Sequence, residues 1–395
     1  MKVHTYIIIL LCGAFLAQCS QNDIETVLNE NAKNDTSSPI DNEQQYNSYW
    51  YYSYTAEQLI TNETLGLESK DFLPYTVANV GDTLFVANSA NTKDLHILLI
   101  DLKTNKTIHT LRTWQVNGEE KTFDTDGTNK IDVILPIGNR LYVAEKQSRI
   151  HVFELPSLNY ITCIGNGIYW SDVFEAQALI IKDGLIFARD KDSQISIYKE
   201  SDLTPENYQK IKRYRKAAGK GASNNQFAPQ NMLLNEDGNI LVTDYAAKKI
   251  RVLEPSLVND NMKNGESIDI ENETLQTTFQ PKVMILKEDR LYVTGGNDQL
   301  NIYDRKLKEW TKSFQNINGY TFSQPARIYA QNDSVFWVSD THNTRRTLVK
   351  MGVYKNEIRE YNRINKNIVK VSGAHPRNGK TTDFLVDLRT HEIID

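Results

Sequence analysis

Chemically different side chains recur at one position of a repeated unit in this sequence. Aligning six copies of the unit backwards from a shared aliphatic position, to within one residue, gives Tyr75, Asp132, Gln177, Gln230, Lys282 and Arg327. A set that combines an aromatic ring, a carboxylate, amides and cations suits a small-molecule or peptide site, because a few polar groups can fix a ligand's orientation. Drift in a degenerate repeat is the alternative explanation.

The same six positions argue against a central metal ion. Calcium takes six to eight oxygen ligands, and catalytic zinc takes three well-placed histidine or acidic ligands. These positions hold one carboxylate, Asp132, while Lys282 and Arg327 would oppose a bound cation. We therefore expect no metal and no cofactor at this site.

A second group of candidates lies in the loops that follow the repeats, which are basic or rich in amides. These residues are Lys93, Lys146, Arg149, Lys191, Lys248, Lys249, Asn297, His342, Arg345 and Arg346. If the loops converge on one face, that face is locally positive and suits a ligand with a carboxylate or phosphate. The alternative is that these cations belong to the ordinary repeat and are solvated.

The elements that must position these residues are strands. In the stretch Gly221–Pro255, two apolar runs flank Asp237-Gly238, a pair typical of a tight β-hairpin. A strand of the same type ends at positions 88, 145, 190, 244, 295 and 340, and these ends lie 45 to 57 residues apart. Spacing of this length is typical of blades of four strands in a β-propeller.

A third strand follows in five of the copies and places a polar residue between apolar neighbours. These polar residues are His96, His151, Ser196, Arg251 and Asn301. The alternation predicts that they lie on a solvated face of the strand. The residues that end the preceding strands, such as Asn88, Asp244 and Asp340, are expected to accept hydrogen bonds from backbone N–H groups in the turn that follows.

Within Gly221–Pro255 the order Asn-Asn-Gln-Phe-x-Pro, Asp-Gly-Asn, Val-x-Asp and Lys-Ile-x-Val-Leu resembles an NHL repeat. The resemblance extends more loosely over about residues 74 to 360, and the chain resembles the propeller lipoproteins of Gram-negative envelopes. It implies an all-β fold, a six-bladed β-propeller of four-stranded antiparallel blades, with seven blades as the alternative. Propellers host binding, scaffolding and catalysis alike, so the resemblance leaves activity open.

The N-terminus predicts export. Lys2, the apolar run Tyr6–Leu16 and Cys19 resemble a lipoprotein signal over residues 1–19, with Gln18 as a departure, and Cys19 is the expected lipid site. Cleavage without lipid and an uncleaved anchor are the alternatives. Residues 20–47 are polar and acidic and are expected to form a disordered tether. Residues 48–395 are expected to form one propeller domain.

Closure of the ring is expected to use both ends of the chain, because an open array would leave an unpaired strand edge. The segment Tyr46–Tyr54 is strand-prone and is predicted to pair either with the sixth blade or with Ile368–Val371 and Phe384–Leu388. Only Cys163 remains once Cys12 and Cys19 are assigned to the signal and the lipid site, and it is expected to be a buried apolar side chain.

The body of the chain is nearly neutral, since the tether carries most of the net charge of −5. This argues against nucleic acid as a partner, because such proteins displace counterions with a basic surface. We expect a non-enzymatic protein, lipid-anchored to the outer membrane of a Gram-negative bacterium, that binds a peptide, glycan or envelope protein. The alternatives are a propeller lyase or hydrolase that uses Asp132, Lys282, Arg327 and His342, and a structural subunit of an envelope complex.

Overall fold

The computed structural model describes residues 49–89, 94–124, 130–145, 149–166, 176, 178–189, 194–218, 227–258, 267–341, 346–376 and 379–394. The expected signal (1–19) and tether (20–47) lie outside the described residues. So do four of the candidate site residues, namely Cys19, Gln177, His342 and Arg345.

The chain divides into two compact units. Among the described residues, one unit lies within Ser53–Tyr354 and includes Pro376 and Gly379, and the other comprises Tyr49–Tyr52, Lys355–His375 and Lys380–Ile394. This division differs from the single domain expected for residues 48–395. The cause is local pairing, because the strands between Tyr361 and Ile394 form a sheet with one another.

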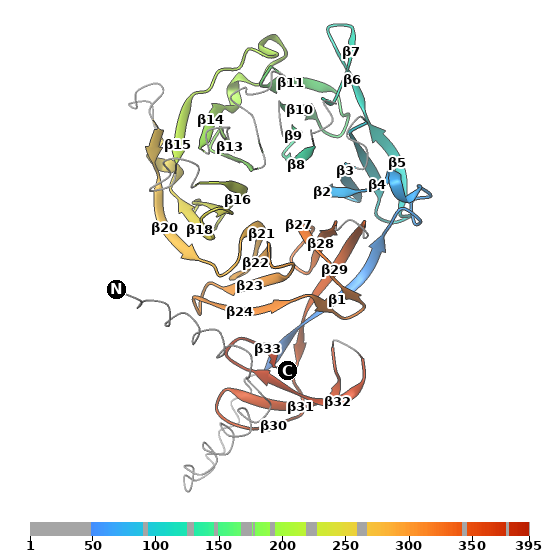
Figure 1. Cartoon of the computed structure of the whole chain (residues 1–395), viewed down its shortest axis with the longest axis vertical. Coiled ribbons are helices and arrows are strands. Elements are labelled where there is room, and N and C mark those ends of the chain that lie inside the picture. Colours follow the sequence, from blue (N-terminus) through green and yellow to red (C-terminus); the bar gives the residue numbers. More distant parts are fainter. Residues whose placement is uncertain are drawn as a thin grey trace, which may run out of the picture. The chain divides into compact units, whose positions relative to one another are not determined.

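The described part of the larger unit contains six sheets of four or five strands, which we number as blades in chain order (Figure 1). Blade 1 consists of β2 (Pro74–Val80), β3 (Thr83–Asn88), β4 (His96–Asp101) and β5 (Lys106–Leu111). Blade 2 consists of β8 (Ile131–Ile137), β9 (Arg140–Glu145), β10 (Ile150–Glu154) and β11 (Tyr160–Ile164). Blade 3 consists of β12 (Leu179–Lys182), β13 (Leu185–Arg189), β14 (Ile195–Lys199), β15 (Arg215–Ala218) and β19 (Ser267–Asp269). Blade 4 consists of β16 (Pro229–Leu234), β17 (Ile240–Asp244), β18 (Lys249–Leu253) and β20 (Glu271–Gln276). Blade 5 consists of β21 (Pro281–Lys287), β22 (Arg290–Gly295), β23 (Leu300–Asp304) and β24 (Glu309–Phe314). Blade 6 consists of β27 (Pro325–Ala330), β28 (Val335–Asp340), β29 (Thr347–Glu357) and β1 (Trp50–Ile60).

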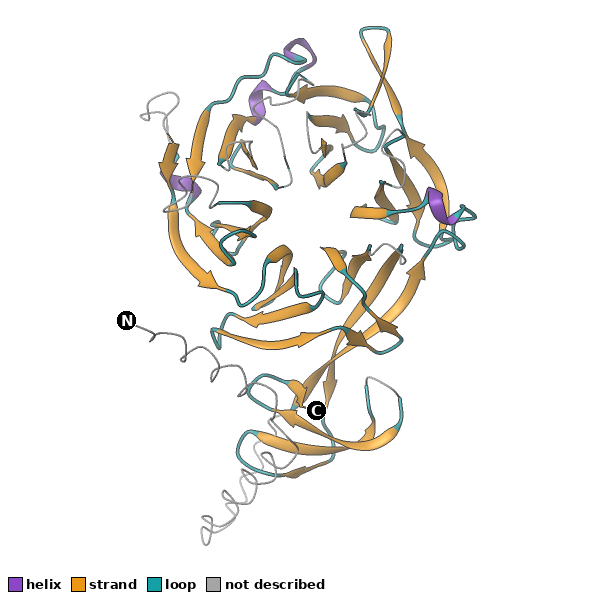
Figure 2. Ribbon diagram, in the orientation of Figure 1, coloured by secondary structure: helices purple, strands orange, loops and turns teal. Residues whose placement is uncertain are grey.

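The innermost strands form a closed cycle of contacts. Strand β2 contacts β8, and the contacts continue through β12, β16, β21 and β27, which contacts β2 again. In Figure 1 the labelled strands β2, β8, β16, β21 and β27 face the common centre of the ring, and Figure 2 shows that the helices between strands are short. The larger unit is therefore a β-propeller, as the repeats predicted.

Local sequence explains the strands. The strands predicted to end at positions 88, 145, 295 and 340 are β3, β9, β22 and β28, and each ends at the predicted residue. In blade 4 the predicted Asp-Gly turn is present, with Gly238 at a φ of +77° that glycine adopts at no steric cost. The Asn235 side chain accepts a hydrogen bond of 2.8 Å from the Asn239 N–H and so fixes the turn.

Apolar side chains of neighbouring blades pack together between the sheets. Leu241 and Ile250 of blade 4, for example, share a core with Met284, Leu291 and Val293 of blade 5. Full burial of one such side chain contributes about 1.5–3 kcal/mol. No blade could bury both of its faces alone, so the ring is stabilised mainly between blades.

Blade 6 closes with the N-terminal strand. Strand β1 pairs with β29 at the outer edge of the sheet, which agrees with the first of the two closures expected for Tyr46–Tyr54. The second closure is wrong, because Ile368–Val371 and Phe384–Leu388 belong to a separate sheet. That sheet is β30 (Tyr361–Arg363), β31 (Ile368–Ala374), β32 (Thr381–Asp387) and β33 (Glu392–Ile394), with Val369, Phe384 and Val386 in its core.

The remaining described elements are small. They are the hairpins β6 (Thr113–Val116) with β7 (Glu119–Thr122) and β25 (Asn316–Ile317) with β26 (Tyr320–Thr321), and the short helices η1 (Ser69–Asp71), η2 (Glu200–Asp202), η3 (Pro205–Asn207) and η4 (Pro255–Leu257). Blade 3 departs from the antiparallel pattern, because β19 pairs with β15 in parallel. The same segment continues into β20, so it joins the outer edges of blades 3 and 4.

Candidate functional site

A β-bulge at the start of the innermost strand positions the predicted site residues. The pairing of this strand with its neighbour shifts register between Pro74 and Val77, and equivalent shifts occur in blades 2, 4, 5 and 6. A bulge redirects a side chain out of the regular alternation. The residues that directly follow the start of the strand are Tyr75, Asp132, Gln230, Lys282 and Ala326. We call the surface formed at this end of the strands the channel-mouth face.

Arg327 lies one residue beyond the position expected for it. Ala326 occupies the equivalent position in blade 6, and Arg327 pairs with Ser339 of β28. The shift is within the one-residue tolerance of the alignment. It places the longest side chain of the set where it reaches residues of three other blades.

The structure brings Arg327 together with three of the other predicted residues. One guanidinium nitrogen (Nη2) lies 3.2 Å from Asp132 Oδ1 and donates to the Tyr75 hydroxyl at 3.3 Å. The other (Nη1) donates to the main-chain carbonyl of Gln230 at 3.3 Å. Arg327 and Asp132 are only 7% and 2% exposed. Arg327 therefore links blades 1, 2, 4 and 6 from within.

The electrostatics of this cluster favour a permanent charge pair. Burial by itself lowers the pKa of the Arg327 guanidinium, but Tyr75 and Asp132 raise it, so its pKa lies above the ordinary arginine value. The guanidinium also lies over the Tyr75 ring, 4.9 Å from its centroid, and the Lys130 ammonium lies 5.1 Å from the same centroid. A cation over an aromatic face is attracted by the ring quadrupole. Arg327 is thus a structural cross-link with its hydrogen bonds already made.

Lys282 differs from Arg327 in having no such partner. Its side chain is half-buried, and within the described ranges its ammonium group forms no ion pair within 4.0 Å and no hydrogen bond. Burial lowers the pKa of Lys282, Asp298 raises it, and Arg327 lowers it. Asp298 lies in the loop after β22 and has a buried carboxylate oxygen with no hydrogen-bond partner among the described atoms. Lys282 is therefore the one described cation of the predicted set left for an external anion.

The carbonyl groups freed by the bulges accept hydrogen bonds from the preceding blade, a feature that the sequence analysis missed. Thr243 Oγ1 donates to the Lys282 carbonyl at 2.8 Å, and Ser339 Oγ donates to the Tyr75 carbonyl at 3.0 Å. Thr294 Oγ1 donates to the Ala326 carbonyl at 3.3 Å. The sequence signal was a small hydroxyl residue in the middle of the Val-x-Asp pattern. These bonds join blades 4, 5, 6 and 1 in sequence around the ring.

The residues that end the second strands are caps, as expected, and three of them also hold a loop that was not predicted. Asn88, Asp244 and Asp340 accept hydrogen bonds from the backbone N–H groups of Leu73, Ala228 and Gln324, at 2.8, 3.0 and 2.5 Å. These donors lie before the innermost strand of the same blade. Asp244 also accepts from the following turn, from the Ala247 N–H at 3.2 Å, as predicted. Residues 90–93 and 342–345, which follow Asn88 and Asp340, lie outside the described residues. The caps fix the loop that leads into the bulge.

The polar residues of the third strands are buried, so the prediction that they face solvent is wrong. Three of them, His96, His151 and Arg251, hold the caps in place. Asn88 Nδ2 lies 3.0 Å from His96 Nε2, His151 Nε2 lies 3.2 Å from Glu145 Oε2, and Arg251 Nε donates to Asp244 Oδ2 at 2.8 Å. A buried polar side chain must be paired, and the repeat supplies the partner in the adjacent strand. Neither histidine is a ligand candidate.

Cys163 and Arg346 are both held within the protein. Cys163 is fully buried in β11, and burial raises the pKa of its thiol, so it is the packed apolar side chain that was expected. Arg346 of the basic loops donates to the Ser69 carbonyl at 2.7 Å and is held by the protein itself. Lys93, Lys146 and Lys191 lie outside the described residues.

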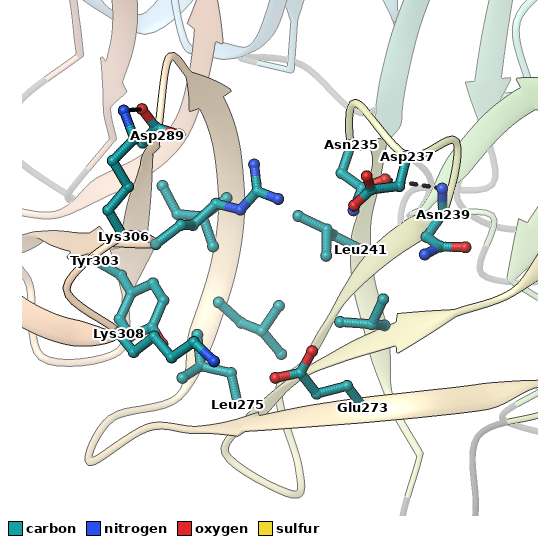
Figure 3. Close-up of a pocket in the computed structure, with 14 residues that line it drawn as sticks. Asn235, Asp237, Asn239, Leu241, Glu273, Leu275, Asp289, Tyr303, Lys306 and Lys308 are labelled. Carbon is teal, nitrogen blue, oxygen red and sulfur yellow. Dashed lines mark hydrogen bonds and ion pairs between the residues drawn. The ribbon is translucent and has the colours of Figure 1, made fainter.

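A groove lies between blades 4 and 5, at the hairpin-turn ends of their strands (Figure 3). It has a volume of about 430 Å³. Its floor includes Leu241, Leu275 and Leu291, and its rim carries charged and amide groups, among them Asp237, Asn239, Glu273, Lys306 and Lys308.

A second groove, between blades 2 and 3, has a volume of about 680 Å³. Its charges are satisfied internally. Glu200 accepts from the Tyr142 hydroxyl at 2.7 Å and lies 3.6 Å from Arg140, and Asp183 lies 3.2 Å from Lys182. The groove offers less to a charged ligand than the first one does.

No three His, Cys, Asp or Glu side chains within the described ranges are grouped closely enough to hold a metal ion. Among the helices that the structure describes, none is long and apolar enough to cross a membrane.

Neither a protein-family model nor a curated protein matches the sequence. Among solved structures, the β-propeller domain of Myceliophteria thermophila Cps50 (Swd1) is similar at 11% identity, over 76% of this chain and 100% of that one, with a TM-score of 0.48. A protein of unknown function from Bacteroides caccae is similar at 12% identity, over 76% and 88%, with a TM-score of 0.44. The computationally designed Ika8 protein is similar at 10% identity, over 82% and 86%, with a TM-score of 0.38. Similarity at this level says nothing of ligand or activity.

Proposed function

We propose that this chain is a non-enzymatic, lipid-anchored envelope protein that binds a peptide, glycan or partner protein on its channel-mouth face. The ligand presents an acidic group to Lys282. The observation that carries the proposal is the half-buried Lys282 ammonium, which has neither an ion pair nor a hydrogen bond among the described residues. An anion at this position would restore the electrostatic stabilisation that burial removes.

The state of Arg327 and Asp132 supports binding over catalysis. A general acid or base must be free to exchange a proton with the substrate. Asp132 is buried against the Arg327 guanidinium at 3.2 Å, and Arg327 itself has its hydrogen bonds made within the ring. The alternative enzyme, with Asp132, Arg327, Lys282 and His342 as reacting groups, would have to break this cross-link first.

The location is part of the same proposal. Cys19 is the lipid site, and the acidic segment 20–47 tethers the propeller to the outer membrane of a Gram-negative cell. Blades of NHL type, six in the ring, are supported by the Gly221–Pro255 motif and by the recurring caps. The alternative is a structural subunit of an envelope complex, which would make contact through blade edges instead.

The proposal is tested by comparing ligand capture by wild-type protein and by Lys282→Gln. Full-length protein with an affinity tag is expressed in its envelope, solubilised in mild detergent, purified, and analysed by mass spectrometry for bound peptide, glycan and protein. The amount of a captured ligand that pairs with Lys282 is expected to be roughly tenfold lower with the variant than with wild type, because the variant loses a charge-assisted contact.

The matched control is Lys103→Gln, which removes an exposed lysine in the turn between β4 and β5. Its captured material should equal that of wild type. If nothing captured by wild-type protein depends on Lys282, the channel-mouth proposal is wrong. Capture that is lost only when the outer strands are altered would favour the structural subunit.

A further inference from the structure

Two opposite charges face the groove between blades 4 and 5 without ion partners. Glu273 lies on β20, Lys308 lies in the turn between β23 and β24, and both side chains are exposed. Across the ranges that the structure describes, neither forms an ion pair within 4.0 Å. Of the other charges at the rim, Arg305 lies 3.1 Å from Glu236 and Lys306 pairs with Asp289. Asp237 accepts a hydrogen bond of 3.2 Å from Asn235 Nδ2.

The groove between the two charges is apolar. Leu241 and Leu291 are buried at its floor, and Val252, Leu275 and Tyr303 are half-buried there. In Figure 3 Lys308 and Glu273 extend toward one another from opposite sides near Leu275, Leu241 lies above them, and Asn239 lies at the upper right. The pKa of the Tyr303 hydroxyl is raised by burial and then by Glu273 and Asp304, which agrees with a carboxylate close to the phenol.

We propose that this groove docks a short extended peptide segment of a partner, in which an apolar side chain lies between one basic and one acidic residue. The apolar side chain covers the leucines, the basic residue pairs with Glu273, and the acidic residue pairs with Lys308. The Asn239 side-chain amide offers a donor and an acceptor to the peptide main chain.

Charge complementarity selects this occupant. An anion alone would leave Glu273 opposing it, a cation alone would leave Lys308 opposing it, and a purely apolar segment would desolvate both. The groove between blades 2 and 3 has the same position in the fold, but there Glu200 is occupied by Tyr142 and Arg140. The free charges are thus a property of the blade 4–5 groove and do not follow from the repeat.

The test uses full-length protein in mild detergent and fluorescein-labelled peptides with a central leucine. One series places lysine before and glutamate after the leucine, with zero to two serines between, and a second series reverses the order. Fluorescence polarisation measures each dissociation constant. One order is expected to bind at least roughly tenfold more tightly than the other, because the wrong order places like charges together.

The decisive variant is Glu273→Lys combined with Lys308→Glu, which should exchange the preference between the two orders. Both residues are exposed, so the variant should fold, and an unchanged melting temperature verifies this. Asp333→Asn, at an 88% exposed side chain in the turn between β27 and β28, is the matched control and should keep the wild-type preference.

Binding of neither series, equal binding of both, or a preference that the double variant does not reverse would each overturn the proposal. The channel-mouth function is tested separately, because Lys282 lies at the other end of the strands. Lys282→Gln should leave the peptide preference unchanged, so the two proposals fail or succeed independently.

Discussion

At the start of the innermost strands, Arg327 joins blades through its hydrogen bonds. It contacts Tyr75, Asp132 and Gln230 of three other blades. A buried charge pair of this kind contributes little more to folding stability than a well-packed apolar pair would. Loss of one partner is nevertheless destabilising, because it leaves the other charge buried and uncompensated. Arg327 is therefore expected to matter for stability, and Lys282 for binding.

Arg327→Leu should destabilise the propeller by about 3–5 kcal/mol, since Asp132 then keeps a buried charge without the arginine. Urea unfolding followed by tryptophan fluorescence measures the change. Adding Asp132→Asn should recover part of the loss, because the buried charge is gone. A loss below about 1 kcal/mol, the range of exposed pairs, would contradict the cross-link.

His96 should make the propeller sensitive to acid. The amide of Asn88 is oriented by the Leu73 N–H and the Asp71 carbonyl, so it presents Nδ2 to His96 Nε2, which must accept. The other ring nitrogen, Nδ1, then donates to the Asp94 carbonyl at 2.8 Å. This arrangement requires the neutral ring, and burial lowers the pKa of His96 below its ordinary value of 6.5.

Because the folded pKa is lowered, the unfolded chain takes up the proton first as the pH falls. The contribution of His96 to stability is complete above about pH 6.5, the unfolded value, and is lost progressively below it. His96→Gln should abolish this part of the pH dependence in urea unfolding between pH 7.5 and 5. The exposed His109→Gln serves as control and should unfold as wild type does. Identical pH profiles for His96→Gln and wild type would contradict the assignment.

At the scale of the element, bulge and hydroxyl act together. Each bulge exposes a carbonyl, and in blades 4 to 6 a threonine or serine donates to the next bulged residue. In blades 1 and 2 the equivalent positions are Ala87 and Ala144. Hydroxyl bonds therefore join blade 4 to 5, 5 to 6 and 6 to 1, and at the equivalent position of blade 3 Arg189 Nη1 donates to the Pro229 carbonyl of blade 4 at 3.2 Å.

Ser339→Ala should lower stability by about 1 kcal/mol, the net value of one buried hydrogen bond, with more lost if the Tyr75 carbonyl remains unsatisfied. Ser339 also accepts from the Arg327 N–H at 3.1 Å, so the change affects both blades at the closure. Ser334→Ala, in the exposed turn of the same hairpin, is the control. Equal unfolding midpoints for the two variants in urea would show that the hydroxyl does not join the blades.

The strands and their order were predictable because apolar alternation and Asp-Gly turns are local. The convergence of Tyr75, Asp132, Gln230 and Arg327 followed from the repeat alone. What alternation could not show was the partner of each polar residue, so His96 and Arg251 were expected in solvent although they hold Asn88 and Asp244. The one-residue shift of Arg327 could not be predicted, because the alignment of the repeats does not take the β-bulge into account. The separate sheet β30–β33 could not be predicted either, because its sequence does not contain the repeat.

At the scale of the whole molecule, the ring closes through the N-terminal strand β1, which completes blade 6. The proposed tether, residues 20–47, precedes this strand in the sequence and carries six acidic residues and one lysine.

Cys19→Ala should move the protein from the membrane fraction to the soluble fraction of the cell, because a lipid chain at this cysteine is the proposed anchor. Cell fractionation and immunoblotting measure the distribution. Cys163→Ala, at a buried cysteine, is the control and should remain with the membrane. Membrane retention of Cys19→Ala would contradict lipid anchoring at this residue.

The central claim, that a ligand binds the channel-mouth face beside Lys282, is tested most directly by photo-crosslinking in living cells. A benzophenone amino acid is placed at Gln230, whose main-chain carbonyl would still accept from Arg327, and at Ser334 at the opposite end of the strands. A covalent adduct from position 230, weakened by Lys282→Gln and absent from position 334, is the predicted result. Adducts that are equal at both positions, or none at position 230, would contradict it.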